Sequence, residues 1–175
     1  MKKSSLWIMA GLSAALLAQP ALADRGFTLE LGQSSESELT YRAGLEFDFG
    51  KPIWQSDAGA VVLDGYWDAG LTYWDGIDAF SVSLAPMFQL NFPRAMNDVT
   101  PFVEAGIGAA LFSKTDLAPG ADIGSAFQFE DRIGLGMRFA SGSELGVRYY
   151  HYSNASLKQP NQGIDKAALY YRVNF

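Results

Sequence analysis

The stretch ELTYRAGLEFDF, residues 38–49, decides the fold, because its side chains alternate in character at every position. The odd-numbered positions are apolar, and the even-numbered positions are charged, polar or glycine. This period of two residues is that of a β-strand, and it disagrees with the period of about 3.6 residues of a helix. The stretch therefore predicts a strand with one apolar and one polar face.

Seven further segments repeat this alternation, at residues 27–32, 61–74, 79–92, 101–112, 126–139, 144–153 and 165–175. Eight strands are an even number and the minimum for bacterial outer-membrane barrels. The chain ends on an aromatic residue after alternating apolar positions, which resembles the C-terminal signal of such barrels. The sequence therefore predicts an all-β fold, an eight-stranded antiparallel transmembrane β-barrel of the outer membrane. Pro86 cannot donate to a ladder, so we expect a local bulge there.

The N-terminal residues carry an export signal. Two lysines precede an apolar run over 6–18, and Ala21 and Ala23 form a small-x-small cleavage site. A membrane anchor is the alternative, but the run is short for a spanning helix and no stop-transfer flank follows. We expect a signal peptide over 1–23 and a single barrel domain over 24–175.

Composition excludes several classes of function. The 175 residues include no Cys and one His, which removes disulfides, thiol nucleophiles and sites built on several imidazoles. The net charge of −6 argues against nucleic acid as a partner. One His leaves almost no room for a zinc or haem site, and the family resemblance described below implies no metal and no cofactor.

The inward faces of the strands carry charges of both signs. We expect a lumen filled by side chains, because eight strands leave no channel. The predicted lumenal charges are Arg42, Glu46, Asp48, Asp64, Asp68, Glu104, Glu130, Arg132, Arg138, Glu144, Arg148 and Arg172. An internal salt-bridge plug is the first interpretation, and a buried proton or ion path is the second.

The turns set the orientation once the N-terminus is placed in the periplasm. The extracellular segments are then 33–37, 75–78, 113–125 and 154–164, and the periplasmic segments are 50–60, 93–100 and 140–143.

The alternation breaks at the extracellular end of the last hairpin. The outward face of the seventh strand continues into His151 and Ser153, and that of the eighth begins at Asp165. Polar groups facing lipid cost free energy unless they are satisfied. A hydroxyl, an imidazole and a carboxylate in reach of one another form a nucleophile, its base and the group that orients the base. Interfacial polarity and turn chemistry are the alternatives. Asp131 is the exception on the outer face, and a contact between protomers or a place on the upper rim would explain it.

Two short stretches around these residues resemble a known family. HYSNA at 151–155 and PNQGID at 160–165 resemble the C-terminal signature of PagL-type lipid A 3-O-deacylases, which are eight-stranded outer-membrane barrels. The resemblance implies His151 as general base, Ser153 as nucleophile and Asn154 as an oxyanion-hole residue. Asp165 stands where the family typically has Glu, and it is shorter by one methylene.

The resemblance also implies the reaction. The expected activity is hydrolysis of the ester-linked 3-hydroxyacyl chain at the 3-position of lipid A, in the outer leaflet, without a cofactor. Two other interpretations stay open: a non-enzymatic barrel for adhesion or membrane stability, and another lipid-modifying barrel such as a palmitoyltransferase. A homodimer is a further expectation by analogy.

Overall fold

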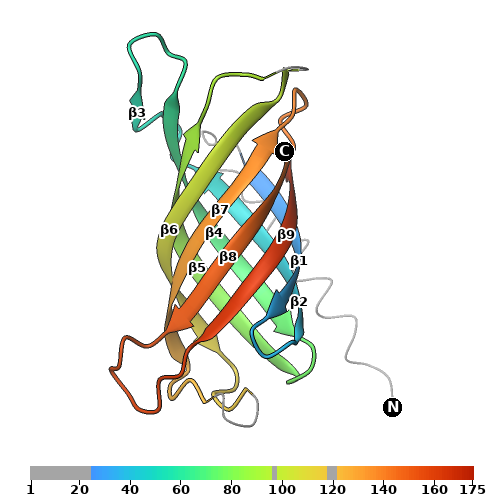
Figure 1. Ribbon diagram of the computed structural model, residues 1–175, viewed down its shortest axis with the longest axis vertical. Coiled ribbons are helices and arrows are strands. Elements are labelled where there is room, and N and C mark those ends of the chain that lie inside the picture. The colour runs from blue at the N-terminus through green and yellow to red at the C-terminus, as the bar shows by residue number, and fades with distance from the viewer. Residues whose placement is uncertain (1–24, 96–97, 118–121) are drawn as a thin grey trace.

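The computed structural model describes residues 25–95, 98–117 and 122–175, and the predicted signal peptide over 1–23 lies outside them. These residues form strands that run up and down around one axis (Figure 1). The strands are β1 (Arg25–Ser34), β2 (Leu39–Asp48), β3 (Trp54–Gln55), β4 (Val62–Trp74), β5 (Ala79–Asn91), β6 (Thr100–Phe112), β7 (Phe127–Arg138), β8 (Glu144–Ser153) and β9 (Ile164–Asn174). No helix in these ranges is long and apolar enough to cross a membrane.

The sheet closes on itself into an antiparallel barrel. Its order is β2-β1-β9-β8-β7-β6-β5-β4-β3, and an additional pairing of β2 with β4 joins the two ends. Eight of the nine strands match the predicted segments, so the predicted eight-stranded barrel is confirmed. The ninth, β3, is paired with the start of β4 and lies within the segment 50–60 that we expected to be a periplasmic turn, longer than usual.

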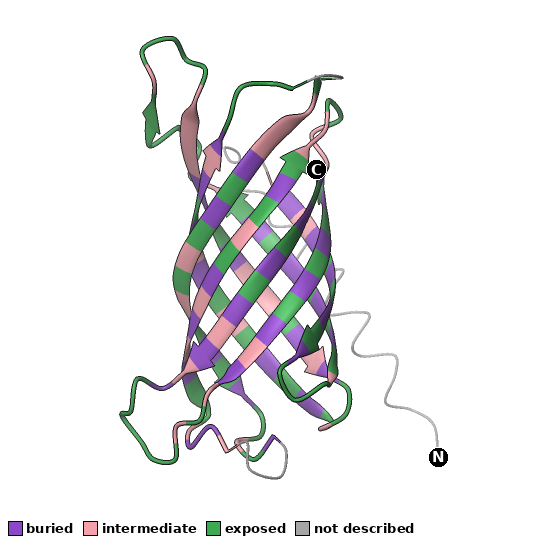
Figure 2. Cartoon of the chain, in the orientation of Figure 1, coloured by how far each residue is buried: buried purple, intermediate pink, exposed green. Residues whose placement is uncertain are grey.

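The alternation of the sequence becomes an alternation of burial. In β8 the burial pattern switches at almost every residue between buried and exposed, and bands of both classes cross every long strand (Figure 2). The large apolar side chains of the outward faces stay exposed, as with Leu45 at 39%, Leu84 at 52% and Leu169 at 54%. An apolar outer wall around a polar interior is what a bilayer requires of a barrel.

Pro86 is accommodated differently from the prediction. Leu84 pairs with Ala109 and Met87 with Gly106, so the β5–β6 register is the same on both sides of the proline. The expected bulge is therefore wrong, because no extra residue enters the strand. The ladder instead skips the pairs at positions 85 and 86, where the proline has no N–H to donate.

The lumen is a network of ion pairs. The Arg148 guanidinium lies 2.8 Å from Glu30, 3.1 Å from Glu46 and 2.6 Å from Glu104. Among the described residues, Glu30 and Lys166 also belong to this network, although the sequence analysis did not include them. Opposite charges that leave water need such partners, so the salt-bridge interpretation of the lumen is the one that the contacts favour.

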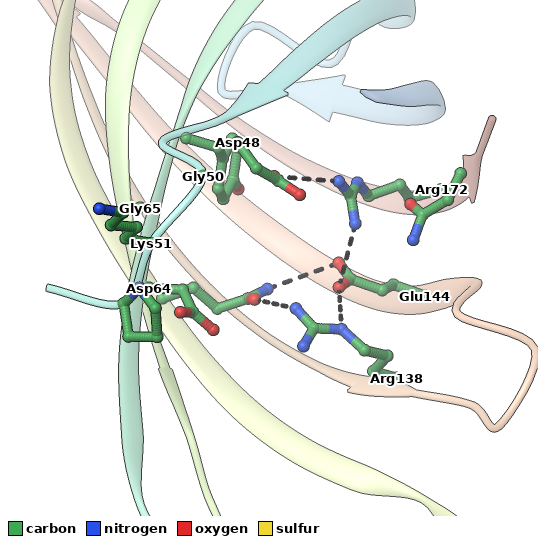
Figure 3. A pocket seen from close by; sticks show the side chains of 12 residues that line it. Asp48, Gly50, Lys51, Asp64, Gly65, Arg138, Glu144 and Arg172 are labelled. Carbon is green, nitrogen blue, oxygen red and sulfur yellow. Dashed lines mark hydrogen bonds and ion pairs between the residues drawn. The ribbon is translucent and has the colours of Figure 1, made fainter. Parts of the chain in front are cut away.

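The two ends of the lumen differ. A polar cavity of about 650 Å³ occupies the end near β3, where Arg138 and Arg172 both reach Glu144 (Figure 3). The opposite end is filled by an apolar cluster, in which Leu117 and Ile123 of the β6–β7 connection are buried with aromatic side chains of the strands. This filled end carries the β8–β9 loop and the residues singled out by sequence.

Candidate active site

His151 and Asp165 lie side by side on the outer wall. They are paired in the β8–β9 register, and Nδ1 of His151 lies 2.7 Å from Oδ1 of Asp165. The side chains remain 44% and 40% exposed, so the pair is open to the surroundings of the barrel. A carboxylate in this position accepts the Nδ1–H and leaves Nε2 of the imidazole free to take a proton.

Ser153 is the last residue of β8 and lies two positions beyond His151 on the same face. It is half-buried. Among the described residues its hydroxyl has no hydrogen bond to His151. Hydrogen bonds between nucleophile and base are often long before substrate binds. The structure thus joins the imidazole to the acid, and it places the hydroxyl as the next side chain on that face.

Asn154 has a different environment from the three outward residues. It is fully buried, and its Nδ2 donates at 2.9 Å to the carbonyl of Ile123 and at 2.9 Å to that of Lys158. Its backbone N–H donates to Oδ1 of Asn161 at 2.9 Å. The side chain therefore ties the turn after Ser153 to the β6–β7 connection.

Gly163 is a residue of the site that the sequence analysis did not select. It has a positive φ of 69°, and a Cβ built on it would lie 3.3 Å from Cε1 of His151 and 2.9 Å from the carbonyl oxygen of Tyr152. Because glycine has no Cβ, the space beside residue 163 is available to the imidazole of His151. The only signal in the sequence is its place in PNQG before the last strand, which by itself indicates a turn.

We expect Gly163→Ala to lower kcat at least tenfold while the barrel still folds. A left-handed φ costs a non-glycine residue about 1–2 kcal/mol, and the new methyl group would displace the imidazole from its carboxylate. The measurement is the rate at which the purified variant releases fatty acid from lipid A, the activity that the resemblance implies. Gly142→Ala is the matched control, since Gly142 also has a positive φ, 83°, but lies in the β7–β8 turn at the other end of the barrel. Equal activity of the two variants would contradict a role for Gly163 in placing the imidazole.

A second carboxylate flanks His151 from the other side. Asp131 of β7 is its register partner across the β7–β8 ladder, so two acids border the imidazole on the outer wall. Asp131 also lines a mainly apolar groove of about 560 Å³ on that wall, and the other lining residues are Pro86, Phe88, Ala105, Gly106, Ile107, Arg132 and Ile133. The groove lies where the β5–β6 ladder is interrupted.

Together, the closed antiparallel barrel, its apolar outer wall and the outward-facing imidazole–carboxylate pair define a class, the outer-membrane barrels with a candidate hydrolase site facing lipid. The sequence matches the lipid A 3-O-deacylase (PagL) family over residues 36–174. The chain belongs to this family, and it is an outer-membrane enzyme that hydrolyses an ester.

Individual relatives agree with this assignment. The chain is 45% identical over 172 residues to the lipid A deacylase PagL of Pseudomonas aeruginosa. The aligned residues cover 96% of this chain and 95% of the relative. It is 41% identical over 114 residues to the lipid A deacylase PagL of Bordetella bronchiseptica, or 62% of this chain and 61% of the relative. A crystal structure of the outer membrane enzyme PagL superposes with a TM-score of 0.78 at 47% identity, covering 85% of this chain and 98% of that one.

Proposed function

We propose that this lipid A 3-O-deacylase uses Ser153 as nucleophile, His151 as general base and Asp165 as the acid that orients the imidazole. The observation that carries the proposal is the contact of 2.7 Å between His151 and Asp165 on the lipid-facing wall, with Ser153 next on the same face. Oγ of Ser153 attacks the carbonyl of the ester while Nε2 of His151 takes its proton. Asp165 stabilises the imidazolium that forms.

Collapse of the tetrahedral intermediate completes the first half of the reaction. His151 returns the proton to the leaving sugar oxygen, and the acyl group stays on Ser153 as an ester. A water molecule, deprotonated by the same imidazole, then attacks this acyl-enzyme and releases the 3-hydroxy fatty acid. Water is the only co-substrate of this scheme.

The turn after Ser153 supplies the oxyanion donors in this proposal. Ala155 and Ser156 have positive φ values of 51° and 62°, and successive N–H groups in such a turn can converge on an anion. Asn154 fixes this turn through its buried amide. Each oxyanion donor is worth about 3–4 kcal/mol in the transition state. Asn154 thereby serves the oxyanion hole through the conformation that it imposes on the turn.

The substrate reaches the site from the outer leaflet. We place the end of the barrel that carries the β8–β9 loop on the extracellular side, where lipid A is found. The groove beside Asp131 then offers an apolar wall against which an acyl chain packs while its ester lies at Ser153. The lipid does not have to leave the membrane to react.

We expect Asp165→Asn to lower kcat at least 100-fold. The amide can hold the imidazole in the wrong tautomer, and it does not stabilise an imidazolium. Asp165→Glu keeps the charge and should retain most of the activity lost in Asp165→Asn. The measurement is kcat with purified variants in the same detergent. Full activity of Asp165→Asn would contradict the role of Asp165.

Mass spectrometry of lipid A tests the proposal as a whole. In cells that express the protein, lipid A should lose the mass of one 3-hydroxyacyl chain, whereas an inert barrel leaves lipid A unchanged and a palmitoyltransferase adds mass.

We also propose a homodimer in the membrane, and chemical cross-linking in native membranes tests it. A purely monomeric pattern would count against it.

A further inference from the structure

Lys158 lies in the loop that follows Ser153, and its backbone is held in place. The amide of Asn154 contacts both of its main-chain groups, because Nδ2 donates to the Lys158 carbonyl at 2.9 Å and Oδ1 accepts from the Lys158 N–H at 3.4 Å. The Leu157 N–H also donates to the Asn154 carbonyl at 3.0 Å. The buried side-chain amide of Asn154, the residue after Ser153, thus holds the backbone of Lys158 in place, while the Lys158 side chain stays exposed.

The surroundings of this lysine are acidic. Eight carboxylates that are not buried lie at this end of the described barrel, at Glu36, Glu38, Asp75, Asp78, Asp116, Asp122, Asp131 and Asp165. The described part of the same end has two lysines that are not in the lumen, Lys114 and Lys158. Lys114 is engaged, since its Nζ donates to the Ile77 carbonyl at 2.8 Å and lies 4.0 Å from Asp78. Within the described residues, Lys158 has no ion-pair partner.

An anionic substrate is repelled by these carboxylates, so its binding at this surface requires a positively charged side chain. Lipid A carries phosphate groups at the level of its sugars, above the acyl esters, and a surface of carboxylates repels them. The neighbouring Leu157 is 75% exposed, so the tip of the loop presents an apolar and a cationic side chain together. This pairing suits the boundary between acyl chains and headgroups.

We propose that Lys158 binds the phosphate on the glucosamine whose 3-position carries the scissile ester, and so selects phosphorylated lipid A as substrate. The inference rests on the proposed function and deepens it. The ammonium is a point charge on a flexible stem, which suits a phosphate that approaches from the membrane surface. The contact is the same before and during the reaction, so it affects binding more than the chemical step.

The test is a thermodynamic cycle in which the lysine is removed from the protein, the phosphate is removed from the substrate, or both are removed. Initial rates are measured for the wild-type protein and for Lys158→Gln, at a fixed detergent ratio, with two substrates. One is bisphosphorylated lipid A, and the other is the same lipid A after mild acid has removed its anomeric phosphate. On the first substrate we expect Lys158→Gln to raise KM about five- to tenfold with kcat nearly unchanged. On the second substrate the two proteins should have the same KM.

Two further variants sharpen the result. Lys158→Arg should keep the wild-type KM, since it keeps the charge, and Lys114→Gln should also keep it, since Lys114 is already engaged within the protein. An equal effect of Lys158→Gln on both substrates, or a fall in kcat with unchanged KM, overturns the inference. If the wild-type protein releases fatty acid from neither substrate, the proposed function fails as well. Activity without phosphate dependence therefore separates the two failures.

Discussion

Ser153→Ala should abolish the release of 3-hydroxy fatty acid, with a fall in kcat of about 10⁴-fold or more. The reason is that the hydroxyl forms the acyl-enzyme, and Ser153 carries the single aliphatic hydroxyl on the outward face of β8. The barrel should be unaffected, because Ser153 is the last residue of its strand and its hydroxyl has no hydrogen bond in the described part of the chain.

The measurement is single-turnover release of fatty acid by the refolded variant, with heat-modifiable gel mobility as the test of folding. Ser141→Ala is the matched control, since Ser141 is an exposed serine in the β7–β8 turn at the other end, where among the described residues its hydroxyl bonds to Ser143 alone. The control should have wild-type activity. Substantial turnover by pure Ser153→Ala protein would rule out the serine mechanism.

His151→Ala should have an effect of similar size, because without the base the hydroxyl of Ser153 is a weak nucleophile. Losses from two members that act as one unit do not add, so the double variant with Ser153→Ala should be no slower than either single variant. The measurement is again kcat in the same detergent. An additive double variant would contradict a shared step.

The imidazole can also be observed directly. His151 is the single histidine of the chain, so a protein labelled with ¹⁵N-histidine gives ring signals from this residue alone. The hydrogen bond to Asp165 should give a downfield Nδ1 proton signal that Asp165→Asn shifts and that Gly142→Ala leaves in place. A spectrum insensitive to Asp165→Asn would mean that the contact does not form in solution.

The sequence predicted the strands well because the polarity of each side chain decides, independently of the others, whether it faces lipid or the lumen. The face of a residue follows from its polarity and its position parity, and both can be read along a short stretch. The same parity placed His151, Ser153 and Asp165 on one outer face at the end of one hairpin. Their residue types suggested a nucleophile, its base and an orienting acid, and the resemblance implied the same roles and added Asn154 as an oxyanion-hole residue.

Other features had no local signal. The bulge expected at Pro86 was wrong, because register depends on the whole ladder and a skipped pair was sufficient. Strand β3 needs the start of β4 beside it, which the segment 50–60 alone does not indicate. Gly163 has a turn-like sequence, but its contact with the His151 ring depends on where β8 lies.

By itself, the sequence determined the barrel, its two faces and the set of polar residues that leave the apolar wall. Only the tertiary structure decided which of them meet: the imidazole with the carboxylate, the Asn154 amide with the carbonyl of Ile123, and Arg148 with three acids of other strands. The physical reason is the distance along the chain between the residues that interact. Polarity partitions each side chain independently, whereas these contacts join residues that come close only when the sheet closes and its loops pack over the end.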